Sequence, residues 1–297
     1  MKLEGVILPV TTPFDGETGE LAPVSFRENL RKWLSAGVSG FVVAGSTGEA
    51  ALIDEDEIVQ LLGWARDIVP PDRLLIAGAG RESTRATVRL CRAVAECGAD
   101  AVLVRPPAYY PKAMDPDTVR RHFEKVADSI PIPLILYHVP QFVPVEIAPG
   151  SCAELCTHHN IIGIKDSTGD LKSLGAFLDV VAGSDNCRVM VGAGSKLYAA
   201  LELGAAGGIV AVGCIAPRFA VDVYRSFCAG DMGSAGKAQS VLTGPHNAIV
   251  RGTGVAGVKY ALDLLGYNGG DPRPPLRPPD ERVRATIRDA LGAVELL

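Results

Sequence analysis

Several features are scarce or absent in this 297-residue sequence, and each absence argues against a class of protein. Lys and Arg (29) do not outnumber Asp and Glu (34), and no basic run or basic-aromatic stretch occurs, which argues against a nucleic-acid partner. No apolar run approaches the ~20 residues that a membrane span needs, so no membrane association is expected. No Gly-Lys-Ser or Gly-Lys-Thr triplet is present, which leaves no sign of a P-loop.

The seven cysteines are scattered and contain no Cys-x-x-Cys pair. Cys152 and Cys156 could share one face of a helix, but two thiols without a second pair do not make a metal site. We therefore expect seven unpaired thiols, no metal, and a reducing cytoplasm. The first residues place an acid, Glu4, where a signal peptide has its apolar core, which also favours a cytoplasmic location.

What the sequence does contain is an alternation of short apolar runs and helical stretches. The runs are continuously apolar, as expected of parallel strands covered by helices. Strands are predicted at residues 5–10, 41–44, 74–79, 101–104, 133–137, 161–165, 188–191 and 208–212. Helices are predicted at residues 23–36, 54–68, 83–97, 116–129, 151–157, 171–181, 195–203 and 217–229.

Eight strand–helix units predict an α/β fold, a (β/α)8 TIM barrel. A doubly wound sheet is the alternative, because it explains the alternation but requires no particular number of strands. Beyond the last unit, helical stretches follow without strands between them, so we expect a catalytic barrel over residues 1–229 and a C-terminal helical extension over residues 230–297. The helices of this extension are predicted at residues 231–242, 255–265 and 279–296, with a loop rich in glycine and proline at 266–279.

Lys165 ends the sixth apolar run, within the segment Gly-Ile-Lys-Asp-Ser-Thr-Gly at residues 163–169. Lysine is rarely buried, and burial disfavours the charged form of an amine. A neutral amine can attack a carbonyl carbon. Lys165 is therefore either a strand-end lysine that reaches solvent or a covalent nucleophile.

Two other segments are expected at the same barrel mouth, because functional residues gather at the C-terminal ends of the strands. Tyr137 ends the fifth run, 28 residues before Lys165, so the two side chains should stand side by side. The second run is followed by Gly-Ser-Thr-Gly-Glu at residues 45–49, whose backbone N–H groups could hold a carboxylate, or simply cap a helix. An amine, a phenol, the hydroxyls of Ser46 and Thr47 and an anion site are what a carbonyl–amine active site requires.

These three segments, in this order and spacing, resemble the dihydrodipicolinate synthase / N-acetylneuraminate lyase family, as does the opening at residues 5–14. The resemblance covers nearly the whole chain. It implies a (β/α)8 barrel with C-terminal helices, a homotetramer built of dimers or a dimer, and a covalent Schiff base between lysine and pyruvate or another 2-oxo acid, with no other cofactor. By this resemblance Lys165 is the Schiff-base lysine, Tyr137 the proton-transferring phenol, and Ser46 and Thr47 the hydroxyls of the carboxylate-binding turn.

The resemblance also assigns residues at the rim and the floor of the site. Tyr109 or Tyr110 matches a tyrosine that the synthase branch contributes across a subunit interface, with Tyr110 the catalytic candidate and Tyr109 a substrate contact. Val210 matches the strand that lines the floor of the pyruvate site. In the 4-hydroxy-2-oxoglutarate aldolase branch, a serine at the position of Ser167 lies near the substrate. Arg105, which follows the fourth run, could bind a distal carboxylate or form a loop salt bridge.

Phe142 bears on the choice of substrate. Synthases that condense pyruvate with aspartate semialdehyde carry an arginine two residues beyond the Val-Pro pair, and Phe142 stands there in this chain. A phenyl ring cannot replace a bidentate guanidinium. We therefore expect a lyase that makes or cleaves a C–C bond between a pyruvate-type 2-oxo acid and an aldehyde, with a substrate like 4-hydroxy-2-oxoglutarate. Dihydrodipicolinate synthase is the alternative.

Other classes of function were weighed against this one. A Gly-x-Gly at residues 78–80 follows an apolar run, but a dinucleotide site needs a third glycine. Glycines at 192–194 and 207–208 lie where other barrels bind phosphate, which keeps a phosphosugar aldolase open. A non-catalytic 2-oxo acid sensor on the same barrel is a further alternative, although a sensor would not need a lysine nucleophile.

Overall fold

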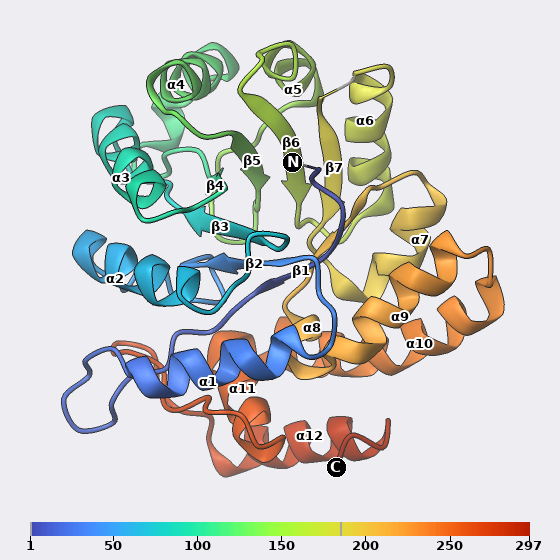
Figure 1. The fold of residues 1–297 in the computed structure, drawn as a ribbon. Coiled ribbons are helices and arrows are strands. Elements are labelled where there is room, and N and C mark those ends of the chain that lie inside the picture. The colour runs from blue at the N-terminus through green and yellow to red at the C-terminus, as the bar shows by residue number, and fades with distance from the viewer. Residues whose placement is uncertain (1, 185) are drawn as a thin grey trace.

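Eight parallel strands close into a barrel in sequence order, and β8 pairs with β1 (Figure 1). The computed structural model describes residues 2–184 and 186–297. This closed barrel confirms the predicted (β/α)8 fold and rules out the doubly wound sheet, which is open. The strands are β1 (Gly5–Pro9), β2 (Gly40–Val43), β3 (Leu74–Gly78), β4 (Ala101–Val104), β5 (Leu134–His138), β6 (Ile161–Asp166), β7 (Arg188–Val191) and β8 (Gly207–Ile209).

Helices cover the outside of the barrel, each turning an apolar stripe towards the strands. Three of them begin at a side chain that accepts a backbone N–H of the first turn: Ser83, Asp115 and Asp170. The helices are α1 (Pro23–Leu34), α2 (Glu55–Arg66), α3 (Thr84–Glu96), α4 (Pro116–Ser129), α5 (Pro149–Leu155), α6 (Leu171–Val181), α7 (Leu197–Glu202), α8 (Val212–Ile215) and α9 (Pro217–Cys228), with the short 3-10 helices η1 (Pro111–Ala113) and η2 (Gly194–Lys196).

The eighth strand is shorter than the sequence predicted. The apolar run at residues 208–212 was expected to be extended throughout, but β8 ends at Ile209 and α8 begins at Val212. A short, fully buried apolar run looks the same whether it forms a strand or a helix, so the hydrophobic pattern could not find this boundary. Gly207 lies so close to β1 that a Cβ on it would come 2.0 Å from the Gly5 carbonyl oxygen, which requires glycine there.

The C-terminal part is helical except for a loop between its last two helices (Figure 1). It consists of α10 (Met232–Pro245), the π-helical η3 (His246–Arg251), α11 (Gly252–Leu264) and α12 (Glu281–Gly292). Helix α10 packs on α9, α11 packs on α8, and Asn268 of the loop between α11 and α12 hydrogen-bonds to Asn29 of α1. The sequence predicted separate helices at residues 231–242 and 255–265, with no helix between them. The chain instead continues as helix through Pro245 and η3, and it is interrupted only by a kink at Gly254, whose φ of 65° is not helical. A division of the chain at residue 230 stays a prediction.

The expectation of seven free thiols was wrong. Cys156 and Cys187 form a disulfide, with their Cα atoms 5.7 Å apart, while the other five cysteines are free. Cys156 follows α5 and Cys187 precedes β7, so the packing of neighbouring strand–helix units around β6 and β7 brings together two residues that are 31 positions apart. Spacing along the chain carried no sign of this contact, because it depends on how neighbouring strands begin. The Cys152 sulfur lies 3.8 Å from the Cys156 sulfur, and within the described part of the chain no group of three or more potential metal ligands surrounds them.

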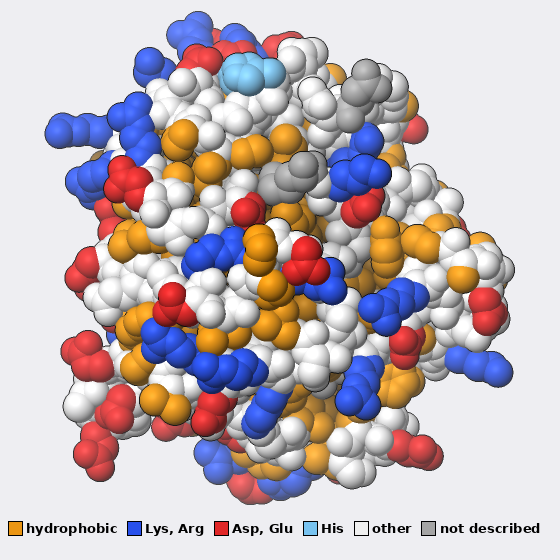
Figure 2. Space-filling view, in the orientation of Figure 1, with side chains coloured by type: hydrophobic (Ala, Val, Ile, Leu, Met, Phe, Trp, Pro, Cys, Tyr) orange, Lys and Arg blue, Asp and Glu red, His pale blue; other side chains and the backbone are white. Residues whose placement is uncertain are grey.

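The surface is mixed in character. Acidic, basic and hydrophobic side chains are interspersed over the face seen in Figure 2. None of the helices in residues 2–184 and 186–297 combines the length and the apolar character that crossing a membrane requires.

Two buried histidines should make the stability of the fold depend on pH. His122 of α4 and His246 of η3 are 5% and 8% exposed, and each has one ring nitrogen without a hydrogen-bond partner among the described residues. Burial, aided by a nearby arginine in each case, lowers the pKa of each imidazole from 6.5 to about 4. As the pH falls below 6.5, the unfolded chain therefore binds protons that the folded chain does not.

We expect the free energy of unfolding to fall by up to about 1.4 kcal/mol per pH unit for each histidine between these pKa values. Urea titrations at pH 7 and pH 5 measure this loss. In a His122→Asn/His246→Asn variant the loss between the two pH values should shrink. An equal loss in the variant and the natural protein would contradict the assignment.

Candidate active site

Lys165 and Tyr137 lie side by side at the C-terminal ends of β6 and β5. The strands pair with Tyr137 opposite Lys165, and the Lys165 Nζ lies 4.3 Å from the centre of the Tyr137 ring. Both side chains are buried, at 5% and 7% exposure. The sequence predicted that Tyr137 and Lys165 lie side by side, because one strand–helix unit separates them, and the structure confirms it. An amine and a phenol thus share one enclosed position at the barrel mouth.

The turn at residues 45–49 meets this pair from β2. The Ser46 Oγ lies 3.3 Å from the Tyr137 hydroxyl oxygen. Among the described residues, the backbone N–H groups of Ser46 and Thr47 have no hydrogen-bond acceptor, while Gly48 and Glu49 donate back into the turn. The next helix, α2, begins only at Glu55, so the turn does not cap a helix. Two free N–H groups beside the phenol form a place where a carboxylate can bind.

Backbone geometry at the start of this turn is unusual. Ala44 directly follows β2 and has φ 54°, a left-handed conformation that costs a residue with a Cβ about 1–2 kcal/mol. Its carbonyl presses against β3, where a Cβ on Gly78 would lie 2.0 Å from the Ala44 oxygen. A kink at Ala44 and a glycine at position 78 together turn the Ser46 side chain towards Tyr137.

His138 follows Tyr137 and points the other way, because side chains alternate along a strand. Its Nδ1 accepts a hydrogen bond from the Ile147 N–H (3.3 Å), and its ring packs against Phe177 of α6. Burial lowers the pKa of His138 despite the nearby Asp166 carboxylate, which favours the charged form. His138 therefore supports β5 from the outer layer.

Asp166 takes the matching position after Lys165. Its carboxylate accepts hydrogen bonds from the Thr168 N–H (3.2 Å) and the Thr168 hydroxyl (2.8 Å). Burial raises the pKa of Asp166, although these bonds act in the opposite direction. The polar segment after Lys165 is thus tied down by its own aspartate, and the strand end that carries the amine is fixed.

Ser167 lies at the rim on the β6–β7 side. Its N–H donates to the His138 carbonyl (2.9 Å), and its carbonyl accepts from the Gln141 side chain (3.0 Å). Its hydroxyl lies against the backbone of Gly192, where a Cβ would come within 2.0 Å. Val210 is fully buried just beyond β8, and its N–H donates to the Ile7 carbonyl (3.2 Å), which places it inside the barrel wall.

Arg105 forms the loop salt bridge that was one of its two expected roles. Its Nη2 donates to Glu82 (2.7 Å), and its Nη1 donates to the Pro106 carbonyl (2.9 Å). Glu82 also accepts from the N–H groups of Ala108 and Tyr109. Burial raises the pKa of Glu82, but these N–H bonds and Arg105 outweigh it and lower the pKa overall. Glu82 therefore organises the loop after β4 and neutralises Arg105.

Tyr109 and Tyr110 project from the same loop and are 75% and 69% exposed. Their rings meet edge to face, 4.9 Å apart. Phe142 is also exposed, at 67%. Within this single chain the structure therefore does not bring either tyrosine to the Lys165 amine.

Sequence reasoning missed the residues that hold the 45–49 turn from behind. The Thr12 hydroxyl donates to the Gly48 carbonyl (2.8 Å), and Glu49 pairs with Lys259 of α11. One signal existed: Lys259 interrupts the apolar helix predicted at residues 255–265, and a lysine on such a face requires a partner. The identity of that partner, 210 residues away, could not be read from the sequence.

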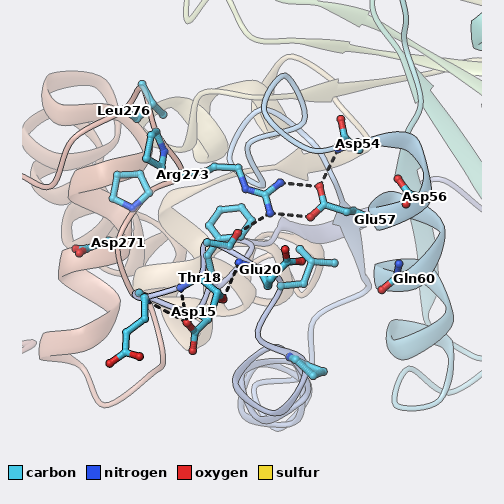
Figure 3. A pocket seen from close by; sticks show the side chains of 18 of the residues that line it. Asp15, Thr18, Glu20, Asp54, Asp56, Glu57, Gln60, Asp271, Arg273 and Leu276 are labelled. Atoms are coloured by element: carbon cyan, nitrogen blue, oxygen red, sulfur yellow. Dashed lines mark hydrogen bonds and ion pairs between the residues drawn. The ribbon is translucent and has the colours of Figure 1, made fainter.

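A hollow of about 970 Å³ lies outside the mouth, between the loop at residues 14–21, α2 and the loop at 271–278. Neither Lys165 nor Tyr137 lines it. The charged side chains that line it are acidic except for Arg273. Arg273 reaches across to Glu57 with two hydrogen bonds of 2.6 and 2.7 Å (Figure 3). This hollow is therefore separate from the candidate active site.

A closed (β/α)8 barrel with a lysine and a tyrosine buried together at the ends of β6 and β5 is the arrangement of the Schiff-base lyases that the sequence resembles. The model of the dihydrodipicolinate synthetase family matches residues 2–294. The chain belongs to this family. It is an enzyme, a class I pyruvate-dependent lyase or aldolase.

Relatives and solved structures agree with this placement. The chain is 34% identical over 295 residues to an uncharacterized DapA-like lyase of Halobacterium salinarum, covering 99% of this chain and 95% of the relative. It is 32% identical to the 4-hydroxy-tetrahydrodipicolinate synthase of Methanopyrus kandleri, covering 100% and 98%. The dihydrodipicolinate synthase of Acinetobacter baumannii complexed with pyruvate matches with TM-score 0.94, 28% identity and full coverage of both chains. YagE, a family member from E. coli K12 in complex with pyruvate, matches with TM-score 0.93, 28% identity and 99% coverage of both chains.

Proposed function

We propose that this enzyme forms or cleaves the C3–C4 bond of a 4-hydroxy-2-oxo acid through a Schiff base on Lys165, with pyruvate as the 2-oxo acid and a substrate like 4-hydroxy-2-oxoglutarate. The observation that carries the proposal is the buried Lys165 amine 4.3 Å from the Tyr137 ring centre, beside a turn with two free N–H groups. The amine supplies the covalent bond, and the turn supplies an anchor for the carboxylate of the 2-oxo acid. No metal takes part in these steps.

In the cleavage direction, the Lys165 amine adds to the C2 ketone, and the resulting carbinolamine loses water to give the protonated Schiff base. The C4 hydroxyl then loses its proton, and the C3–C4 bond breaks. The protonated imine at C2 accepts the electron pair of this bond, which gives the enamine. An aldehyde departs. A proton added at C3 and the addition of water at C2 then release pyruvate and restore the amine.

These steps move protons, and we assign the proton transfer to Tyr137. Its hydroxyl lies 3.3 Å from the Ser46 Oγ, which can pass a proton towards the mouth. We assign the N–H groups of Ser46 and Thr47 to binding the substrate carboxylate. We assign the Thr47 hydroxyl, which belongs to the same turn, to a catalytic role as well. Val210 bounds the floor of the pocket.

The rest of the rim would contact the aldehyde portion. Ser167 is our candidate for the C4 hydroxyl, since it lies next to the Lys165–Asp166 segment. Arg105 can take a distal carboxylate only by exchanging its bond with Glu82. In a dimer or homotetramer, the exposed Tyr109 and Tyr110 would enter the mouth of a neighbouring subunit, with Tyr110 joining the proton relay.

Condensation of pyruvate with aspartate semialdehyde is the second candidate function. It is favoured by relatives that carry the name 4-hydroxy-tetrahydrodipicolinate synthase, at 32% and 33% identity. Phe142 argues against it, because a guanidinium is expected at that position for the second carboxylate. Either reaction passes through the same Lys165 enamine, so the two differ only in the aldehyde.

Borohydride reduction in the presence of pyruvate tests the shared step. A reduced pyruvate adduct on the peptide that contains Lys165 is the expected result, and its absence at saturating pyruvate would refute the covalent mechanism. The choice of aldehyde is tested by comparing pyruvate release from 4-hydroxy-2-oxoglutarate with the condensation of pyruvate and aspartate semialdehyde. We expect the first to be faster by about 10²-fold or more, because a second carboxylate without a cationic partner costs binding free energy on this scale. Efficient condensation without retro-aldol cleavage would instead establish the synthase.

A further inference from the structure

Glu49, the last residue of the carboxylate-binding turn, points away from the mouth into the protein. Its side chain is fully buried, and its backbone has φ 61°, a left-handed conformation. The Glu49 N–H closes the turn by donating to the Ser46 carbonyl (3.1 Å). Whatever holds the Glu49 side chain therefore also holds the residue that closes the turn and sets where the Ser46 and Thr47 N–H groups lie.

The group that holds it is Lys259 of α11. The Lys259 Nζ donates to the Glu49 Oε1 (2.7 Å) and to the Asp271 carbonyl (2.8 Å), and it lies 4.4 Å from the centre of the Phe14 ring. Burial lowers the pKa of Lys259, and Glu49 counteracts this effect. An ammonium group buried this completely persists only when it is paired. Helix α11 of the C-terminal part thus contacts the turn at residues 45–49 through the Lys259–Glu49 ion pair.

The loop that follows α11 secures the same segment from the outer side. The Arg273 N–H donates to the second carboxylate oxygen of Glu49 (2.8 Å), so both oxygens are used. The Arg273 guanidinium donates to the Leu52 carbonyl (3.0 Å) and makes a two-point ion pair with Glu57 (Figure 3). The whole connection from the turn to α2 is therefore fastened to residues 259–273.

We propose that Lys259 is a positioning residue for the carboxylate of the 2-oxo acid: through Glu49 it fixes the turn whose free N–H groups bind that carboxylate. The inference rests on the proposed function. It makes the C-terminal helices part of substrate binding, although α11 carries no group that touches the substrate. Without the ion pair, Glu49 can leave its left-handed conformation and the turn loses its fixed shape.

The experiment is borohydride trapping on Lys165 at increasing pyruvate concentration in a Lys259→Met variant. We expect the pyruvate concentration for half-maximal trapping to rise about tenfold or more, the effect of losing one charge-assisted hydrogen bond to the carboxylate. The maximal extent of trapping should be unchanged, because Lys165 and Tyr137 are untouched. Leu291→Ala, a truncation in the buried face of α12, is the control. It destabilises the same helices and should leave half-saturation unchanged.

A Glu49→Gln/Lys259→Met variant separates positioning from folding, because it leaves no unpaired buried charge and is expected to fold even if Lys259→Met does not. A raised half-saturation at normal thermal stability supports the proposal. Normal half-saturation in this folded variant would overturn it. If the natural protein forms no adduct at all, the proposed function fails. If the natural protein forms the adduct and the variants match it at every pyruvate concentration, only the role of Lys259 fails.

Discussion

A Lys165→Ala variant is expected to lose pyruvate release from the 4-hydroxy-2-oxo acid by at least about 10⁴-fold, the scale on which enzymes lose a covalent nucleophile. Without the imine, no electron sink at C2 accepts the electron pair of the breaking C3–C4 bond. Lys165 is the lysine that the structure buries against Tyr137, so its removal takes the amine out of this position. Coupled assays of pyruvate release measure the rate, and intact mass after borohydride treatment measures the adduct.

Lys165→Arg is the matched control for this loss. It keeps a positive charge at the end of β6 but cannot form a Schiff base, because a guanidinium stays protonated. Both variants should therefore be inactive and free of adduct, while their thermal unfolding should show a folded barrel. An adduct of undiminished yield in Lys165→Ala would place the nucleophile elsewhere and contradict the assignment.

Tyr137→Phe is expected to slow turnover by about 10²-fold or more, the usual effect of a lost acid–base group. The ring remains against the Lys165 amine, so the pocket keeps its shape, but the hydroxyl 3.3 Å from the Ser46 Oγ is gone. Schiff-base formation should slow down while its final extent at saturating pyruvate is retained. Stopped-flow or quenched borohydride time courses distinguish these two quantities.

Tyr260→Phe provides the comparison for this variant. It removes the same hydroxyl from a tyrosine of α11 whose hydroxyl accepts a hydrogen bond from Arg288 (2.8 Å), outside the mouth. It should turn over at the normal rate. A Tyr137→Phe enzyme that is as fast as Tyr260→Phe would remove Tyr137 from the proton path.

The barrel could be predicted from the sequence because its signal is local. Each strand is a short continuous apolar run followed by a helix of its own, and the repetition fixes the closure. The pair of Lys165 and Tyr137 followed for the same reason, since residues one strand–helix unit apart end neighbouring strands. The C-terminal boundary of β8 did not follow, because residues 208–212 are equally compatible with a strand and with a buried helix.

The contacts that escaped prediction join distant parts of the chain through single side chains. The Cys156–Cys187 disulfide depends on how the segments before β6 and β7 pack together. The Glu49–Lys259 pair depends on how α11 packs near the turn that follows β2. Neither leaves a periodic pattern along the sequence. Arg105 illustrates a related difficulty: its position at the rim was evident, but its engagement by Glu82 required the conformation of the loop after β4.

The ion pair between Glu49 and Lys259 has a consequence for how the enzyme matures during synthesis. Ribosomes deliver the chain from its N-terminus, so the turn and all eight strands emerge well before Lys259 does. A nascent chain can therefore assemble its barrel wall while the Glu49 carboxylate still faces water or an unpaired interior. Only when the last helices emerge does the ammonium reach that carboxylate. If Lys259 positions the carboxylate-binding turn as proposed, this turn takes its final shape only after α11 has emerged, and a chain released earlier would bind the 2-oxo acid poorly.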